Sequence, residues 1–294
     1  MNEESAPSVA VIVLNWNGWR DTLECLASLE TLDYPDYEVV VVDNGSTDGS
    51  EEKIRERFLR VAVVQTGSNL GFAAGNNAGV EYALAQDANF VWLLNNDTLV
   101  EAGALSAMVQ AMCEDGEIGA VGSVLRYIDE PDRIQCYGGG WVRPWLGMSR
   151  WFNSPVPDEI LRRHLHYIMG ASLLIRREAI EHAGFLDEGF FMYWEDADYG
   201  FRLLKNGWRL AVAPGSTVWH KESAVPGKSE ALDFNFNASA VRFFKKHSPF
   251  PLAPILIGVG GRFTKRVLRG DWARARAVAR GAFAGWRPAR RSRK

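Results

Sequence analysis

An aspartate stands where a buried strand is expected to end in this chain of 294 residues. The segment FVWLLNNDTLV begins at Phe90 with five apolar residues and continues into two asparagines and Asp97. A carboxylate at the end of a strand can bind Mg²⁺ or Mn²⁺, because these ions prefer oxygen ligands and keep positions open for phosphate oxygens. Capping of a following helix explains Asp97 equally well from the local sequence alone.

A second group of carboxylates lies in the segment WEDADYGFR, where a helix is expected to begin. Glu195, Asp196 and Asp198 stand close together there, and the helix macrodipole alone can explain acidic residues at this place. A carboxylate in a partly desolvated cleft can also remove a proton from a hydroxyl group. Crowding of like charges would raise the pKa of at least one of them. Arg202 either pairs with one of these carboxylates or lies on a solvated helix face.

Strands and helices alternate regularly through the first 124 residues. Continuous apolar runs rich in β-branched residues predict strands, and apolar residues at helical spacing predict the helices between them. This alternation indicates an α/β fold with an open, mostly parallel sheet and helices on both faces, in which ligands bind beyond the carboxyl ends of the strands. Asp43 and Asp97 both lie at that edge. We expect strands at 8–14, 39–42, 61–65, 89–94 and 118–124, and helices at 19–32, 50–58, 72–85 and 101–113.

The regular pattern stops at residue 125 and returns near residue 166. The prolines, glycines and aromatic residues of 125–165 predict a loop. Beyond it we expect a strand and a helix over 167–184, an extended segment followed by a helix from about Glu195, strands at 208–214 and 217–220, and a helix over about 232–246.

A set of motifs in one order closely resembles the family-2 glycosyltransferases, and among them the rhamnosyltransferase-like group. The motifs are VVVVDNGSTDGS, NLGFAAGNNAG, LLNNDT, GASLLIRREA, GFLDEGFFMYWEDADYGFRLLKNGW and VWH, and the resemblance covers about residues 8–245. It implies the GT-A fold, a nucleotide-sugar donor linked to dTDP or UDP, a divalent metal, and inversion at the anomeric carbon of the sugar.

The resemblance also implies contacts to the donor. It implies that Asp43 accepts a hydrogen bond from the pyrimidine of the donor. An Asx turn with Ser46 or Thr47 is an alternative role for Asp43, and both roles can hold at once. Gly71 would allow close approach of the backbone to the nucleotide, and helix capping explains Asn69 nearly as well. The full set of donor-binding candidates is Asn15, Asp43, Asn69, Gly71, Asn76, Asn77, Asn95 and Asn96.

The metal motif of this family is Asp-x-Asp, and the chain departs from it at the first position, which is Asn95. Asp97 is therefore the carboxylate ligand that the resemblance retains. It also matches His220, in VWH, to a histidine that binds metal in relatives, and a structural histidine is the alternative. The expected metal is Mn²⁺ or Mg²⁺, and an imidazole ligand favours manganese.

For catalysis the resemblance identifies Asp196 as the base, with its neighbour Glu195 as the substitute. The acceptor would contact aromatic residues of 137–152 and small residues near the floor of the cleft, although ordinary packing explains the same residue types. The acceptor-binding candidates are Trp141, Trp145, Gly170, Ala171 and Trp194.

Charge divides the chain into two unlike parts. From Arg262 onward there are twelve basic residues and one acidic residue, a net charge of +11, whereas residues 1–261 have 21 basic and 35 acidic residues and carry −14. Apolar residues recur among the arginines at near-helical spacing, a pattern typical of a basic amphipathic helix in a membrane interface. Packing on the acidic surface of the catalytic domain is the main alternative, and we do not expect nucleic-acid binding because no recognition motif is present.

Other features limit the location and the domain organisation. The beginning of the chain, MNEESAPS, has no apolar core, no apolar run reaches eighteen residues, and the three widely spaced cysteines indicate neither a disulfide framework nor a zinc site. We expect a cytoplasmic enzyme, peripheral at the inner face of the plasma membrane. The expected domains are a glycosyltransferase domain at 1–248, with a donor half (8–124) and an acceptor half (125–248), and a basic helical extension at 249–294.

The function predicted from these features is metal-dependent, inverting transfer of a sugar to a glycan or lipid-linked glycan, with L-rhamnose from dTDP-rhamnose as the preferred donor. A donor such as UDP-galactofuranose or UDP-N-acetylglucosamine, or a protein that binds carbohydrate or nucleotide without catalysis, is the alternative. A Rossmann dehydrogenase is disfavoured because NWNGW, and no G-x-G-x-x-G, follows the first strand. The same segment is a poor match to the phosphate loop of a sugar nucleotidyltransferase.

Overall fold

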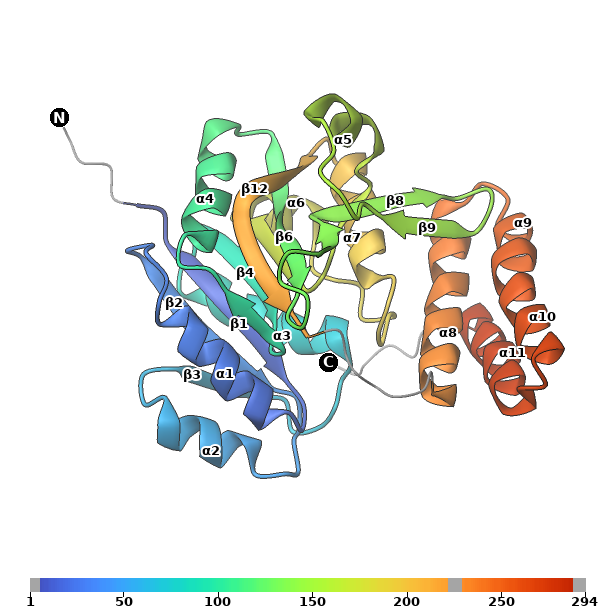
Figure 1. The fold of residues 1–294 in the computed structure, drawn as a ribbon, viewed down its shortest axis with the longest axis horizontal. Coiled ribbons are helices and arrows are strands. Elements are labelled where there is room, and N and C mark those ends of the chain that lie inside the picture. The colour runs from blue at the N-terminus through green and yellow to red at the C-terminus, as the bar shows by residue number, and fades with distance from the viewer. Residues whose placement is uncertain (1–5, 222–228, 288–294) are drawn as a thin grey trace.

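A computed structural model describes residues 6–221 and 229–287, and Figure 1 shows the fold that they form. Helices cover both faces of a central sheet, and a second group of helices lies beside it. The strands are β1 (Val9–Asn15), β2 (Tyr37–Asp43), β3 (Ala62–Gln65), β4 (Phe90–Asn95), β5 (Thr98–Val100), β6 (Ile118–Tyr127), β7 (Ile134–Tyr137), β8 (Gly139–Arg143), β9 (Met148–Trp151), β10 (Tyr167–Ile168), β11 (Ser172–Arg176) and β12 (Arg209–His220). The helices are α1 (Trp19–Leu29), α2 (Ser50–Arg57), α3 (Phe72–Ala85), α4 (Ala104–Glu114), α5 (Asp158–His164), α6 (Arg177–Ala183), α7 (Glu195–Lys205), α8 (Glu230–His247), α9 (Leu252–Pro254), η1 (Ile255–Val259), α10 (Gly260–Leu268) and α11 (Trp272–Trp286).

The main sheet is mixed and mostly parallel along its first strands. Its order is β3-β2-β1-β4-β11-β6-β12-β5, and β7 pairs with β6 outside this path. The strands from β3 to β4 run parallel, β11 runs antiparallel to both of its neighbours, and β12 runs parallel to β6. The predicted α/β class is therefore confirmed, and the two halves of the predicted catalytic domain share one continuous sheet.

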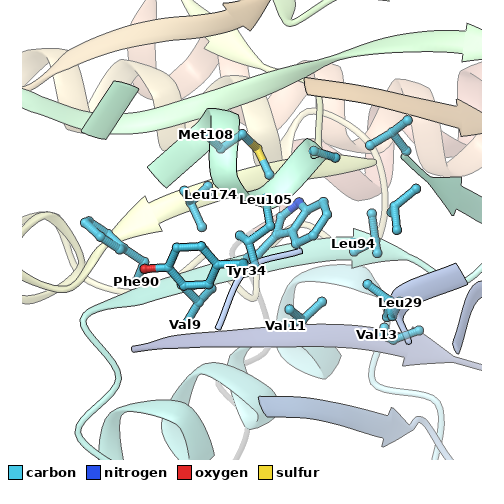
Figure 2. Close-up of a cluster of buried hydrophobic side chains, with 14 of the residues drawn as sticks. Val9, Val11, Val13, Leu29, Tyr34, Phe90, Leu94, Leu105, Met108 and Leu174 are labelled. Carbon is cyan, nitrogen blue, oxygen red and sulfur yellow. The ribbon is translucent and has the colours of Figure 1, made fainter. Parts of the chain in front are cut away.

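Alternate residues of the parallel strands supply the two faces of the core. On one face, Val9, Val11 and Val13 of β1 pack with residues of α1 and α4, as Figure 2 shows for Leu29, Leu105 and Met108. On the other face, intervening residues of β1 such as Ile12 pack with α3, α6 and α7. Because both faces are covered, the strands read as continuous apolar runs. Burial of these apolar runs holds the parallel strands side by side. The polar residues that follow the strands therefore lie together at one edge of the sheet.

Our prediction that residues 125–165 form a loop is wrong. The structure continues β6 to Tyr127 and then forms β7, β8, β9 and α5 there. Strands β8 and β9 form an antiparallel hairpin, and β10 joins it to give a second sheet with the order β10-β8-β9. Glycine permits this close pairing, because a Cβ atom on Gly139 would lie 1.9 Å from the carbonyl oxygen of Tyr167. Glycines that indicate a loop in the sequence are here needed for contact between strands.

The C-terminal helices pack on α8 and form the right-hand part of Figure 1. Gly281 and Gly285 of α11 let the two helices approach closely, since a Cβ atom on either would lie 2.2 to 2.3 Å from a carbonyl oxygen of α8. Asp233 on α8 receives ion pairs from Arg266 and Arg274. No helix in the described ranges is long and apolar enough to cross a membrane. The last basic residues of the predicted extension, from residue 288 onward, lie outside the described residues.

Candidate active site

A cavity of about 340 Å³ opens at the carboxyl ends of the central strands. Its lining comes from the end of β4, the end of β12, the segment before β11, the start of α7 and the β8–β9 hairpin. These elements are far apart in the sequence, and the sheet order brings them together. The predicted site residues that line this cavity are Asn95, Gly170, Ala171, Trp194, Glu195, Asp196 and His220.

On one side of this site Asp97 and His220 lie next to each other. The Nε2 atom of His220 is 3.3 Å from Oδ1 of Asp97, and the amide nitrogen of Asn95 is 3.4 Å from the same Nε2 atom. On the opposite side of the ring, Nδ1 is 2.9 Å from Oε1 of Gln135, which as a carbonyl oxygen can only accept. This bond places the proton on Nδ1 and leaves the lone pair of Nε2 facing Asp97.

The alternative in which Asp97 caps a helix is wrong. Strand β5 follows Asp97 immediately. Helix α4 begins only at Ala104, its N-cap residue is Gly103, and no side chain caps it. A short strand at 98–100 therefore replaces the first residues of the helix that we expected at 101–113. Pairing of β5 with the end of β12 brings His220 opposite Thr98 and so next to Asp97.

Asp97, His220 and Asn95 fit one divalent ion. Two ligands of an octahedral ion with bonds of about 2.1 Å stand about 3 Å apart, close to the 3.3 Å between Asp97 Oδ1 and His220 Nε2. The amide of Asn95 can present its oxygen after a rotation about χ2. No group of three His, Cys, Asp or Glu side chains suited to a metal occurs in the described part of the chain. Substrate oxygens and water are ligands that could complete the coordination of the ion.

On the other side of the cavity lie Glu195 and Asp196, at the start of α7. Burial raises the pKa of Asp196 to about 6, although its carboxylate accepts hydrogen bonds from the backbone N–H groups of Ala197 (2.7 Å) and Gly170 (3.4 Å). Burial and then the charge of Asp196 raise the pKa of Glu195 well above its usual range. Glu195 is 6% exposed, and its Oε2 atom has no partner among the described residues. Asp196, which has the hydrogen bonds that stabilise an anion, is therefore expected to ionise first.

Asp198, the third carboxylate of the motif, has a different environment. Its side chain is buried and pairs with Arg202 (2.8 Å), Lys246 (2.8 Å) and His247 (2.7 Å). Burial opposes its ionisation, but the hydrogen bonds from His247 and Lys246 and the charge of Arg202 outweigh burial and lower the pKa to about 2. Asp198 thus stays charged and links α7 to α8, and Arg202 has the paired role that the sequence left open.

The backbone that leads to Glu195 is strained. Tyr193 and Trp194 both have φ values of +68°, in the left-handed region that residues with a side chain rarely adopt. Trp194 is held by its ring, which packs against Phe236, Phe243 and Phe244 of α8 at centroid distances of 4.8 to 5.8 Å. This packing fixes the turn that directs the two carboxylates into the cavity. Trp194 therefore lines the cavity and also positions α7.

The pKa of Asp196 predicts how a reaction that uses this base depends on pH. Only the deprotonated carboxylate accepts a proton, so the rate should be constant above about pH 7 and should fall about tenfold per pH unit well below pH 6. The measurement is kcat/KM for transfer between pH 4.5 and 8.5, with the melting temperature followed at each pH. A rate that stays constant down to pH 4.5 would contradict this assignment.

A second pocket, of about 360 Å³, lies at the ends of β2 and β3 and is lined by Asp43. The carboxylate of Asp43 accepts hydrogen bonds from Asn15 Nδ2 (2.7 Å), from the hydroxyl and N–H of Ser46 (2.5 and 3.3 Å) and from Gln65 Nε2 (2.7 Å). The Asx turn with Ser46 is therefore present. A nucleobase that bound Asp43 would have to replace one of these donors, and Gln65 is the exposed one.

Asn15 and Asn96 belong to a hydrogen-bonded chain across this edge of the sheet. The amide of Asn96 donates to Thr22 Oγ1 (3.0 Å), Thr22 donates to Asn15 Oδ1 (2.9 Å), and Asn15 donates to Asp43. Asn15 and Thr22 are fully buried. The network connects the ends of β4, β1 and β2, so it fixes Asp43 relative to the segment that holds Asp97.

The turn before α3 uses its predicted residues for internal contacts. Asn69 does not cap α3, because its Oδ1 atom accepts from the N–H of Gly71 (2.9 Å) and from Asn44 (3.2 Å). Gly71 has a φ of +87°, and a Cβ atom there would lie 2.4 Å from the carbonyl oxygen of Phe191. The close approach at Gly71 is thus to the segment before α7, and this contact explains the glycine without a nucleotide.

Asn76 and Asn77 are also used within the protein. Both side chains are buried in α3. Asn76 donates to the carbonyl of Phe72 (2.9 Å), and Asn77 exchanges two hydrogen bonds with the backbone of Leu186 (2.9 and 3.0 Å). These contacts attach α3 to the segment before α7, so we interpret both asparagines as structural.

The aromatic residues of the hairpin are divided between the cavity and its surroundings. Trp151 lines the cavity, together with Tyr167 of β10, whereas Trp141 and Trp145 are not among its lining residues. Trp145 contacts Phe250 instead, with ring centroids 5.4 Å apart. Gly170 and Ala171 form part of the lining, as the sequence predicted.

Sequence reasoning missed three residues with clear positions in these sites: Gln135, Trp151 and Gln65. Gln135 and Trp151 fell in the segment that we expected to be a loop, so no strand pattern connected them with His220 or the cavity. Gln65 ends β3 at the same edge as Asp43, and that strand-end position was a usable signal. Parallel pairing places Gln65 directly opposite Asp43.

The known proteins that this chain is similar to include several glycosyltransferases. The sequence model described as Glycosyl transferase family 2 matches residues 8–184. An N-acetylglucosaminyl-diphospho-decaprenol L-rhamnosyltransferase of Mycobacterium tuberculosis is 30% identical over 255 residues, which are 78% of this chain and 82% of that protein. Among solved structures, a mannosyltransferase of Pyrobaculum calidifontis in complex with GDP-Man and Mn²⁺ has a TM-score of 0.61 at 23% identity, with 97% of this chain and 78% of that chain covered. GalNAc-T7 with UDP, GalNAc and Mn²⁺ has a TM-score of 0.65 at 16% identity, with 94% and 55% covered.

Proposed function

The chain belongs to glycosyl transferase family 2, whose members are nucleotide-sugar glycosyltransferases with the GT-A fold, and on this premise we propose that it transfers L-rhamnose from dTDP-rhamnose with inversion. The proposed acceptor is a lipid-linked glycan. Support for both comes from the relative in Mycobacterium tuberculosis, whose name specifies rhamnose as the sugar and a diphospho-decaprenol on the acceptor. As an enzyme of this family, the chain is not a binding protein without catalysis.

One observation carries the proposed reaction. The base candidate Asp196 and the ligand candidates Asn95 and His220 line the same cavity from different elements. Inverting transfer in one step requires a base on the acceptor side of the anomeric carbon and positive charge on the side of the leaving diphosphate. The cavity has a candidate base on one side and candidate ligands for a cation on the other, and one-step transfer needs no nucleophilic side chain.

In the proposed mechanism Asp196 accepts the proton of the acceptor hydroxyl as the oxygen attacks the anomeric carbon. A bond forms between that oxygen and the carbon, and the bond from the carbon to the phosphate oxygen breaks, so the electron pair leaves with the nucleoside diphosphate. Asp97, His220 and Asn95 would hold Mn²⁺ or Mg²⁺, which when bound neutralises charge on the diphosphate. Burial and the charge of Asp196 raise the pKa of Glu195 well above its usual range, which favours Asp196 as the base.

The proposed donor site extends from the cavity to the pocket at Asp43. Asp43, Ser46 and Gln65 present a carboxylate, a hydroxyl and an amide at the ends of β2 and β3. A carboxylate can accept from the imide N–H of thymine or uracil, so this pocket suits either pyrimidine. The division into a donor half at 8–124 and an acceptor half at 125–248 remains a functional proposal, as does a cytoplasmic location at the inner face of the plasma membrane.

The donor assignment predicts a selective thermal shift. In the presence of Mn²⁺, dTDP-rhamnose should raise the melting temperature by several degrees, because a ligand at about 100 times its Kd adds about 2.7 kcal/mol to the free energy of unfolding. Differential scanning fluorimetry should compare it with dTDP, UDP-galactofuranose and UDP-N-acetylglucosamine at equal concentration. A larger shift with either UDP-sugar would replace the rhamnose assignment and leave the family assignment intact.

A further inference from the structure

The stretch formed by α9, η1 and α10 packs Arg262 and Arg266 on α8, together with Ile255 and Val259, and turns five other large apolar side chains outward. Arg262 donates to Oδ1 of Asn237 on α8 (2.7 Å), and Arg266 donates two bonds of 3.1 Å to Asp233. The opposite side of the stretch is apolar and exposed. Its members are Leu252 (60% exposed), Leu256 (71%), Ile257 (52%), Phe263 (40%) and Leu268 (81%).

The spacing of these apolar residues puts them in two rows. Leu252, Leu256 and Phe263 are four and seven residues apart and form one row, and Ile257 and Leu268, eleven residues apart, form the other. A helix on a globular protein normally turns its apolar residues toward the core, and Ile255 and Val259 of this stretch do so. The two rows are exposed in addition, which indicates a binding surface.

The tip of the β8–β9 hairpin extends this surface. In Figure 1 the hairpin reaches from the catalytic domain to α9. A Cβ atom on Gly147 would lie 2.2 Å from the carbonyl oxygen of Pro254, so the tip is in tight contact with the helix. Trp145, which contacts Phe250, is 52% exposed at this tip. We use the name apolar face for Trp145, Leu146, Phe250, Leu252, Leu256, Ile257, Phe263 and Leu268.

Positive charge surrounds the apolar face. Between Arg262 and Arg287 there are eight basic residues and one acidic residue, Asp271. Arg262, Arg266 and Arg274 face α8, where Asp233 pairs with the last two, and the other five basic residues are exposed. Lys265 and Arg269 are exposed and pair with no carboxylate among the described residues. A second copy of the chain would bring the same positive charge to this face, whereas an anionic lipid surface brings the opposite charge.

We propose that the apolar face is a membrane-binding surface, on which the side chains enter the interface of an anionic bilayer and the flanking cations contact lipid head groups. The orientation of the cavity is consistent with this surface, because the same hairpin contributes Ser149 and Trp151 to the cavity lining. If the acceptor is lipid-linked, a point that rests on the proposed function, the enzyme meets it at the bilayer surface with the cavity next to the hairpin.

The test is cosedimentation of the full chain with vesicles of phosphatidylglycerol and phosphatidylcholine in equal amounts. We expect binding that falls with rising NaCl and is weak to vesicles of phosphatidylcholine alone. Leu256→Gln with Ile257→Gln should reduce the partition coefficient about tenfold or more, and Lys265→Gln with Arg269→Gln about 30-fold. Leu59→Gln, an 88% exposed leucine between α2 and β3 at the far end in Figure 1, is the matched control and should bind as the wild type does.

The same samples should be tested by sedimentation velocity and by the donor thermal shift. A donor shift that persists in every variant shows that the variants fold and keeps the membrane test separate from the function test. Equal partition of all variants would overturn the proposal, and so would absence of binding to anionic vesicles. A dimer that dissociates in the Leu256→Gln, Ile257→Gln variant, without vesicle binding, would assign the apolar face to a second copy instead.

Discussion

Asp196→Asn is expected to lower the rate of sugar transfer by about 100-fold or more at pH 7.5 while donor binding persists. The substitution keeps the volume and the two backbone hydrogen bonds from Ala197 and Gly170, but an amide cannot accept the proton of the acceptor hydroxyl. The measurement is kcat with a saturating donor, together with the thermal shift caused by the donor. Residual activity of the variant should no longer depend on pH near 6.

The stability of this variant separates lost chemistry from lost structure. The folded-state pKa of Asp196 is raised to about 6 from an ordinary value of 3.8, so between these pH values the folded protein holds a proton that the unfolded chain releases. The free energy of unfolding therefore falls as the pH rises through this window. Asp196→Asn removes this cost, so the variant should melt at the same temperature as the wild type or higher at pH 7.5.

Glu195→Gln provides the comparison that can reject the assignment of the base. Burial and the charge of Asp196 raise the pKa of Glu195 well above its usual range and disfavour the anion that a base requires, so an amide in its place should reduce the rate far less than Asp196→Asn does. If Glu195→Gln is inactive and Asp196→Asn retains its rate, Glu195 is the base. The two residues are adjacent and both line the cavity, so only kinetics can distinguish them.

The parts of the fold that were predicted correctly have strong local signals. The apolar runs of β1, β2 and β4 indicate buried strands, and the polar residues after them indicate the edge of the sheet where ligands bind. Asp43 and Asp97 were therefore predicted correctly to lie at that edge. The acidic start of α7 was also predicted at its observed residue, Glu195. These features depend on residues that are neighbours in the sequence.

The parts that were not predicted depend on contacts between distant segments. Strands β8 and β9 are short, and β8 begins with two glycines. The hairpin is held because β10 pairs with β8 and α9 contacts its tip, which no local pattern reveals. The contact of Gly71 with Phe191 is another such case, because a glycine that touches a distant backbone looks the same in the sequence as one that touches a nucleotide. The pairing of Gln135 with His220 requires β6, β7 and β12 to be neighbours.

The inward-turned arginines show a further limit of sequence patterns. Helical spacing identified the C-terminal helices as amphipathic but could not say which side faces the protein. Asp233 and Asn237 of α8 pair with Arg266 and Arg262, so part of the inward side is polar and several apolar side chains stay exposed. Of the two alternatives weighed for the extension, packing on the domain is what the structure shows for this side, and binding to a membrane stays a proposal for the exposed side.

Removal of the metal site is expected to abolish transfer. Asp97→Asn should reduce kcat/KM to about 1% of the wild type or less, because the substitution removes the carboxylate that lies beside His220 and with it the charge that would hold a divalent ion against the donor diphosphate. Excess EDTA should inactivate the wild type to a similar extent, and Mn²⁺ should restore it. The melting temperature without metal should change little, since Asp97 lies at the surface of the cleft and its backbone contacts remain.

The control for Asp97→Asn is Asp87→Asn, which removes one negative charge from a residue whose side chain is 90% exposed at the end of α3, and it should leave activity unchanged. Titration of Mn²⁺ by isothermal calorimetry in the presence of dTDP gives a readout that does not depend on turnover. The affinity for Mn²⁺ should fall in Asp97→Asn. It should also fall, to a smaller extent, in His220→Gln, because imidazole is a better ligand for manganese than an amide is. Full activity of the wild type in excess EDTA would exclude a catalytic metal, and Asp97 and His220 would then have only a structural role where β5 pairs with β12.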